Sequence, residues 1–172
     1  MAEIEAQKAQ IFSQYAPKIP SVANYCVKAL ETGAYDGALL LDAGFEEFQP
    51  LFGQDAYSAE FETEQFNSRV FVGKKAPNCS IRFYGVYVDA HREAFVQALQ
   101  EQGFQLTKAS PQDPITEVTI AGALGMARSN VQYAKRDDLI LELALVSSPG
   151  GRKSGFVDEV ILKVNAALLP FE

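Results

Sequence analysis

Two cysteines, Cys26 and Cys79, have the most interpretable chemistry in this chain. Cys26 falls in an apolar stretch with helical spacing, and Cys79 stands at the head of an apolar stretch typical of a strand. A single pair of cysteines at wide separation fits one structural disulfide, which would place the protein outside a reducing cytosol. We therefore expect Cys26 and Cys79 to be bonded, tying a helix to a strand.

A histidine-based site is not supported, because His91 is the only histidine. A metal cluster or a nucleophilic triad needs partners at suitable spacing, and the sequence has no His-x-x-x-His motif and no close pair of cysteines. Asp89 and Glu93 lie beside His91 in the first turn of a helix that we expect over residues 90–102. The sequence predicts an exposed histidine, no metal site and no cofactor.

The loop over residues 148–155 is rich in glycine and precedes an expected helix. Backbone amides at a helix N-terminus, together with Arg152, Lys153 and Ser154, could hold an anion. The phosphate loop of nucleotide-hydrolysing enzymes carries glycines where this chain has Ser147 and Arg152. Arg152, Lys153 and Ser154 are therefore a candidate anion site, and an exposed turn is the plainer interpretation.

Three pairs of adjacent acidic residues resemble, in residue type only, the two carboxylates of a glycosidase. Neighbouring residues mostly point in different directions, and acids are favoured in turns and in first helical turns. We assign no catalytic residue to these pairs, which are Glu46/Glu47, Asp137/Asp138 and Asp158/Glu159.

Aromatic residues gather between positions 45 and 71 without a clean period. Aromatic side chains are enriched at interfaces, so the segment could face a protein partner or an apolar ligand. The alternative is that the rings fill the core beneath a loop. The candidate interaction surface consists of Phe48, Phe52, Tyr57, Phe61 and Phe66.

The composition excludes several classes of protein. The 172 residues are 48% hydrophobic with a net charge of -7, which is typical of a folded domain and does not favour binding to nucleic acid or to an anionic membrane. No apolar run approaches the roughly 18 residues that a membrane helix needs. Residues 1–7 lack the features of a signal peptide. The chain is therefore cytoplasmic or a mature exported protein, and the cysteines favour the second.

The first 45 residues are expected to be helical. Residues 3–15 read as a polar helix that Pro17 and Pro20 break, and Ser21 is a candidate N-cap for a helix over 22–32. Asp36 can cap a short third helix that ends at Gly44 followed by Phe45. The helix over 90–102 ends with the same Gly-Phe pair, Gly103-Phe104.

Strands dominate the rest of the chain. Residues 46–65 are the least clear and read as a loop followed by a strand or a polar turn. The strand over 79–88 is apolar on both faces, so it is expected to be central in its sheet. The predicted strands are 69–72, 79–88, 104–107, 117–121, 127–134 and 139–146, the first two forming a hairpin.

The C-terminal segment is predicted to be a helix over residues 155–169. Its apolar residues fall at i, i+3, i+4, i+7, i+10 and i+11, and Pro170 follows as a stop. We expect this stripe to be among the best-buried surfaces of the chain. Its members are Val157, Val160, Ile161, Val164, Ala167 and Leu168.

The order of Cys26, Gly44-Phe45 and Cys79 resembles that in small exported bacterial proteins of unknown function. The resemblance covers about the first 105 residues. It implies a periplasmic location and a Cys26–Cys79 bridge, and it supplies no catalytic residues.

Together these patterns predict one α+β domain over residues 1–172, with a helical part over 1–45 and a sheet with two helices over 66–169. The expected sheet is mainly antiparallel, has five or six strands, and is covered by the inserted and C-terminal helices, with the N-terminal helices at one end. The expected function is non-catalytic binding of a protein partner, as in an inhibitor or immunity-type protein. The alternative is a small-ligand-binding protein or an enzyme with a pocket under residues 45–71.

Overall fold

The computed structural model describes residues 2–48, 56–64, 67–75, 78–84, 88–107, 116–120, 123–147 and 157–164. Its helices are α1 (Ala2–Tyr15), the 3-10 helix η1 (Ala16–Lys18), α2 (Ile19–Thr32), α3 (Ala38–Asp42) and α4 (Val88–Glu101). Its strands are β1 (Glu46–Phe48), β2 (Ala56–Glu62), β3 (Asn67–Lys75), β4 (Asn78–Tyr84), β5 (Gln105–Leu106), β6 (Thr116–Ile120), β7 (Ala123–Arg136), β8 (Leu139–Ser147) and β9 (Val157–Val164).

The N-terminal helices follow one another more closely than their prolines predict. Pro17 lies inside η1, and Pro20 lies in the first turn of α2, where its missing N–H costs no intrahelical hydrogen bond. The prediction that Ser21 caps α2 is wrong, because the helix already begins at Ile19. Gly33 ends α2 in the left-handed conformation, with φ of 73°.

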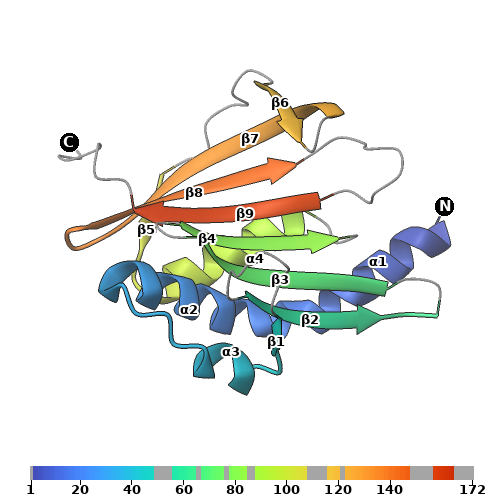
Figure 1. The fold of residues 1–172 in the computed structure, drawn as a ribbon, viewed down its shortest axis with the longest axis horizontal. Helices are drawn as coiled ribbons and strands as arrows, with labels where there is room; N and C mark the ends of the chain where they lie inside the picture. The colour runs from blue at the N-terminus through green and yellow to red at the C-terminus, as the bar shows by residue number, and fades with distance from the viewer. Residues whose placement is uncertain are drawn as a thin grey trace.

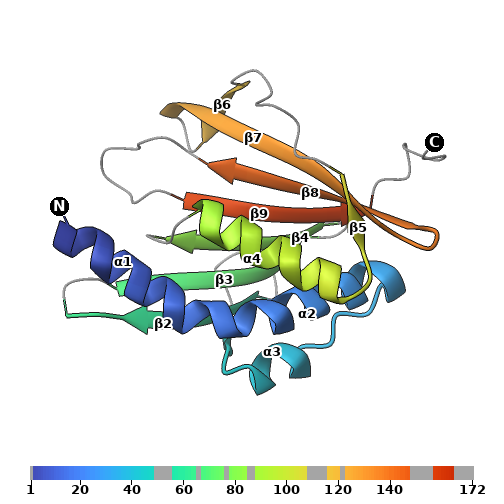
Figure 2. The same cartoon turned by 180° about the vertical axis from the view of Figure 1, so that it is seen from behind.

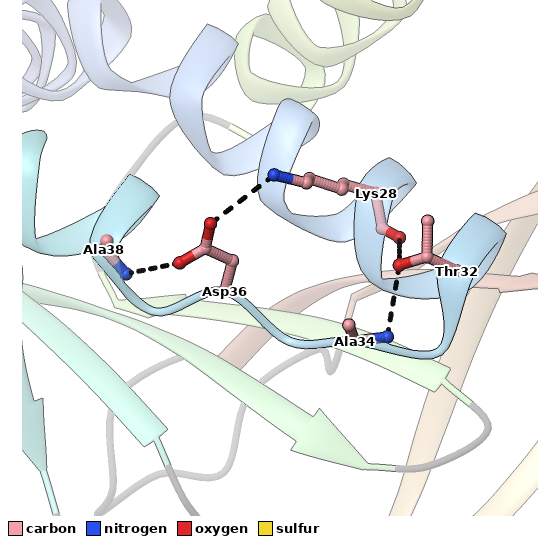
Figure 3. Close-up of polar contacts among 5 residues, drawn as sticks. All are labelled: Lys28, Thr32, Ala34, Asp36 and Ala38. Carbon is pink, nitrogen blue, oxygen red and sulfur yellow. Dashed lines mark hydrogen bonds and ion pairs between the residues drawn. The ribbon is translucent and has the colours of Figure 1, made fainter.

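The loop from α2 to α3 is held by polar contacts of both helices (Figure 3). Thr32 Oγ1 donates to the carbonyl of Lys28 at 2.7 Å and accepts from the N–H of Ala34 at 3.2 Å. Asp36 accepts from the N–H of Ala38 at 3.2 Å, so it stabilises the start of α3 as predicted, although Gly37 occupies the N-cap position. The ammonium of Lys28 lies 3.4 Å from the other carboxylate oxygen of Asp36.

Both Gly-Phe pairs end a helix in the predicted way. Gly44 has φ of 87° and Gly103 has φ of 89°. The N–H of Phe45 donates to Leu40 O at 3.0 Å, and the N–H of Phe104 donates to Leu99 O at 3.1 Å. These are the long hydrogen bonds of Schellman motifs, and the apolar residue that follows each glycine is buried. A short strand follows directly in each case, β1 after Gly44-Phe45 and β5 after Gly103-Phe104.

The strands form an antiparallel sheet in the order β1-β2-β3-β4-β9-β8-β7-β5, and β6 pairs with the first residues of β7 (Figure 1). The described residues thus contain nine strands, more than the five or six expected. The additional strands are the short edge strand β1, the strand β2 in the uncertain segment, and β9. Each predicted strand has a counterpart, but the one over 79–88 was predicted too long, since β4 spans Asn78–Tyr84 and Val88 already belongs to α4. The β3–β4 hairpin is confirmed, and β4 is central as expected.

The predicted C-terminal helix is wrong, because Val157–Val164 forms strand β9. This strand pairs antiparallel with β4 on one side and with β8 on the other, so it lies at the centre of the sheet. Val157, Val160, Ile161 and Val164 are β-branched, which favours extended backbone and disfavours a helix. Ala167 and Leu168 lie outside the described residues.

Helices α1, α2 and α4 lie on one face of the sheet and α3 lies beside the edge strand β1 (Figure 2), and no described helix covers the other face (Figure 1). Helix α2 packs against α4, and both contact central strands. The sequence predicted that α4 and a C-terminal helix would cover the sheet, but the second covering helix is α2. The prediction that the N-terminal helices lie at one end of the sheet is therefore wrong for α2. The buried core lies between this helical layer and alternate residues of the strands, among them Val70, Val72, Ile81, Leu141 and Leu143.

No helix within the described ranges has the length and apolar character needed to cross a membrane.

Candidate functional site

Cys26 and Cys79 form a disulfide that joins α2 to β4, as predicted. Their Cα atoms are 5.6 Å apart, and both side chains are completely buried. Cys26 lies on the buried stripe of α2 together with Val22, Tyr25 and Ala29. The bond fixes the helical layer to the centre of the sheet, and its burial indicates a structural role.

The prediction that His91 is exposed is wrong, because its side chain is completely buried. A hydrogen bond of 2.9 Å joins its Nε2 atom to the hydroxyl of Tyr15, which is also completely buried. The Tyr15 and Phe95 rings lie 5.0 and 6.2 Å from the imidazole. His91 occurs four residues before Phe95 and eight before Leu99, which is the spacing of the buried face of α4. That spacing is the signal in the sequence that could have placed His91 in the core.

Burial sets the charge of this pair. It lowers the pKa of His91 to about 3 and raises the pKa of Tyr15, so both groups are neutral at ordinary pH. A buried histidine beside a tyrosine hydroxyl resembles an acid–base pair, but neither side chain is exposed to solvent. The pair therefore links α1 to α4 as part of the core.

The predicted aromatic surface is divided between the two faces of the sheet. Phe61 is buried on the helical face, with its ring 5.6 Å from that of Tyr15. Tyr57 is half-buried on the same face, 6.1 Å from the ring of Tyr25. Phe48 is half-buried, and its ring lies 5.3 Å from that of Phe71 on β3, which the register places on the opposite face. Phe52 and Phe66 lie outside the described residues.

A tyrosine cluster joins α2, the α2–α3 loop and β2. The rings of Tyr35 and Tyr57 lie 6.0 and 6.1 Å from the ring of Tyr25. Burial raises the pKa of Tyr35. A Cβ atom at Gly37 would overlap the hydroxyl of Tyr57, so the cluster needs glycine there. The sequence shows no periodic signal for this cluster, because its members come from three segments.

A cleft of about 430 Å³ opens beside β2 at the point where β1 begins. Its lining is mostly polar and comes from η1, the end of α3 and the first three strands. The lining residues are Lys18, Gly44, Glu46, Glu47, Phe48, Ser58, Ala59, Glu60 and Arg69.

The two cations of the cleft are both held by neighbours. The ammonium of Lys18 donates to the carbonyl of Ala43, and Arg69 forms an ion pair with Glu60 on the adjacent strand. The Arg69 guanidinium also lies 5.8 Å from the centre of the Phe71 ring. Glutamates are in excess around the cleft, since Glu46, Glu47 and Glu60 line it and Glu62 and Glu64 follow nearby on the chain.

The other candidate residues do not gather at this cleft. Glu46 and Glu47 line it from β1, whereas the exposed Asp137 and Asp138 form the β7–β8 turn and the third acidic pair lies in β9. Arg152, Lys153 and Ser154 fall outside the described residues. Across the described ranges, no group of three or more histidine, cysteine or acidic residues is arranged to hold a metal ion.

Comparison with protein-family models, curated proteins and solved structures finds no match for this chain. The function is therefore inferred from the geometry.

Proposed function

We propose that this protein is a non-catalytic binding domain that recognises a basic protein partner at the edge of its sheet. The contact surface, here called the β1–β3 surface, consists of the helix-free face of the first three strands and the cleft beside them. It includes Glu46, Phe48, Ser58, Glu60, Arg69 and Phe71.

The observation that carries the proposal is the Phe48–Phe71 pair. The two rings contact each other, both are half-buried, and the strand register places them on the face opposite the helical layer. No described helix covers that face of the sheet (Figure 1). Aromatic side chains surrounded by polar groups are typical of the centre of a protein interface. Ser58 and Glu60 of β2 and Arg69 of β3 lie around this pair on the same face.

The charge of the surface favours a basic partner. Five glutamates lie on or next to the first two strands, whereas the lining of the cleft contains two cations, Lys18 and Arg69. Complementary charge raises the rate of association and selects among partners more than it adds affinity. The net charge of -7 for the whole chain acts in the same direction.

A small-ligand site or an enzyme active site is less well supported. Pockets for small molecules are mostly apolar with a few convergent polar groups, whereas this cleft is lined mainly by polar residues. His91 and Tyr15 do not line it.

We further propose that the protein acts in an oxidising compartment such as a bacterial periplasm, with the cytoplasm as the alternative. The Cys26–Cys79 disulfide supports this location, because such bonds persist mainly outside reducing compartments. Alkylation of free thiols in intact source cells, followed by mass spectrometry, tests it. Two modified cysteines per chain would contradict the proposal.

Site-specific photo-crosslinking tests the binding function. A benzoylphenylalanine at Ser58 probes the β1–β3 surface, and the same group at the exposed Ser13 of α1 is the matched control. In the source organism we expect a discrete adduct from position 58 and none from position 13. Phe71→Ala should remove the adduct while the melting temperature shows that the fold persists. Equal adducts at both positions, or an adduct that Phe71→Ala leaves unchanged, would contradict the proposal.

A further inference from the structure

The edge strand β1 covers only part of its neighbour. Strand β2 pairs with β3 over all seven of its residues, from Ala56 to Glu62, but with β1 only over Ala56, Tyr57 and Ser58. In Figure 1, β2 continues past β1, and within the described part of the chain no further strand pairs along its outer edge. Within the described part of the chain, residues 59–61 of β2 thus have a strand on one side only.

The cleft lies at this step in the edge. Glu46 is the first residue of β1 and lies opposite Ser58 of β2. Because the two strands are antiparallel, a longer β1 would place the residues before Glu46 opposite Ala59 and Glu60. Instead, Gly44 with φ of 87° and the buried Phe45 turn the chain into the end of α3. The space along the edge of β2 remains as a cleft lined by Lys18, Gly44, Ala59 and Glu60.

At the far end of the step, α1 contacts the edge through a side chain. The side-chain amide of Gln14 donates to the carbonyl of Glu62 at 3.2 Å. An exposed edge of this kind is a template for the backbone of another extended segment.

The residues of the edge define what the added segment would carry. Glu60 is exposed, while Ala59 and Phe61 are buried on the helical face. Directly opposed side chains on paired strands share a face, and opposite charges at such positions are favourable. A segment along this edge therefore needs Lys or Arg opposite Glu60 and apolar residues on either side of it.

We infer that the β1–β3 surface binds its partner by strand addition: an extended segment with alternating basic and apolar residues continues β1 along residues 59–61 of β2. This inference rests on the proposed function and names the chemistry of the partner. The excess of glutamates around the step selects for the basic residues, and the cleft accommodates the end of the segment near Gly44.

Titration with short peptides tests the inference. The probe is the acetylated, amidated octapeptide (Lys-Val)4, and the controls are (Glu-Val)4 and a (Lys-Val)4 peptide with N-methyl groups on alternate amides. We expect (Lys-Val)4 to bind at least tenfold more tightly than either control. Backbone amide shifts and slowed hydrogen exchange should be confined to residues 58–62. Equal binding of the N-methylated peptide, shifts elsewhere, or no binding would each overturn strand addition.

Variants separate this inference from the broader proposal. Glu60→Lys should weaken (Lys-Val)4 binding about tenfold or more, whereas Glu93→Lys on α4 makes the same charge change away from the edge and should leave it unchanged. Unchanged binding by Glu60→Lys would contradict the inference. One further outcome separates the two proposals: position 58 gives a crosslink that depends on Phe71, but the peptide does not slow hydrogen exchange in β2. That outcome would support the protein-binding function and reject only strand addition. Absence of both the crosslink and the slowed exchange would reject the two proposals together.

Discussion

The Tyr15–His91 pair shows how burial decides the role of a reactive residue type. Two side chains that act as acid and base in many active sites are here completely buried and joined by a 2.9 Å hydrogen bond. The neutral forms are favoured, because burial removes water from both rings and so penalises a charge on either of them. The pair contributes to stability while both groups remain neutral.

We predict that acid destabilises the fold through His91. Its pKa is about 3 in the folded state against 6.5 for an unperturbed imidazole, so between these values the unfolded chain binds the extra proton. The contribution is present above pH 6.5 and is lost as the pH falls towards 3, by at most about 1.4 kcal/mol per pH unit. Urea unfolding of the wild type and His91→Gln between pH 7.5 and about 4 measures it. Parallel stability curves for the two proteins would exclude this role.

A second prediction at this scale concerns Gly37. Replacing it by alanine places a Cβ atom into the hydroxyl and ring of Tyr57, and overpacking of this kind costs about 1–3 kcal/mol. The matched control is Gly73→Ala, whose added Cβ has no neighbour closer than 4.0 Å. Thermal unfolding should show a clear loss for the first variant and little change for the second. Similar melting temperatures would mean that Tyr57 does not pack against the α2–α3 loop.

At the scale of elements, β9 has the largest effect on the architecture. It connects β4 to β8, and so joins the strands that precede α4 to those that follow it. A strand in this position has backbone hydrogen bonds on both sides, whereas β5 pairs only with β7 in the described chain. Single changes in β9 should therefore cost more than the same changes in β5.

Proline substitution tests this difference. Ile161→Pro removes a ladder N–H and introduces a steric conflict in a strand paired on both sides, and the unpaired partner carbonyl alone costs about 1–3 kcal/mol. We expect loss of the cooperative unfolding transition. Gln105→Pro at the sheet edge, where the residue is exposed, should keep the transition. If Ile161→Pro unfolds like the wild type, residues 157–164 are not a central strand in solution.

Seen as a whole, the molecule contains two similar halves. Each has a helix that ends in Gly-Phe, a short edge strand and then three longer strands that run to the centre, where β4 meets β9. The order of the first half, β1-β2-β3-β4, is mirrored by β9-β8-β7-β5 in the second. The halves differ in the inserted strand β6 and in the disulfide, which lies entirely in the first half.

We predict that the disulfide stabilises the whole molecule by about 4 kcal/mol in the chain-entropy model, since it closes a loop with a sequence separation of 53 residues. Urea unfolding with and without a reductant measures this difference. The double variant Cys26→Ala with Cys79→Ala should match the reduced wild type and be insensitive to the reductant. Two free thiols per chain in denatured, unreduced protein would contradict the bond itself.

The parts of the fold that depend only on residues close together in the sequence could be predicted from it. Gly44-Phe45 and Gly103-Phe104 ended their helices as expected, because a Schellman motif is a local structure. The segment of β9 could not be assigned in this way, since its apolar spacing also fits a helix and its pairing with β4 depends on residues far along the chain. A pocket under residues 45–71 was the alternative expectation, but the position and the polar lining of the cleft could not be predicted. The cleft results from the register of β1 on β2, which no short stretch of sequence specifies.

The central position of β9 also matters during synthesis on the ribosome. This strand emerges after the other eight described strands, so until then one side of β4 and one side of β8 lack their neighbour. The strands β1 to β4 precede α4 along the chain and can pair before β9 is made, but the sheet cannot close until residues 157–164 have left the exit tunnel. A stop codon shortly before this segment should therefore leave two exposed strand edges in the middle of the protein, and it should yield an aggregating product rather than a shortened one that folds.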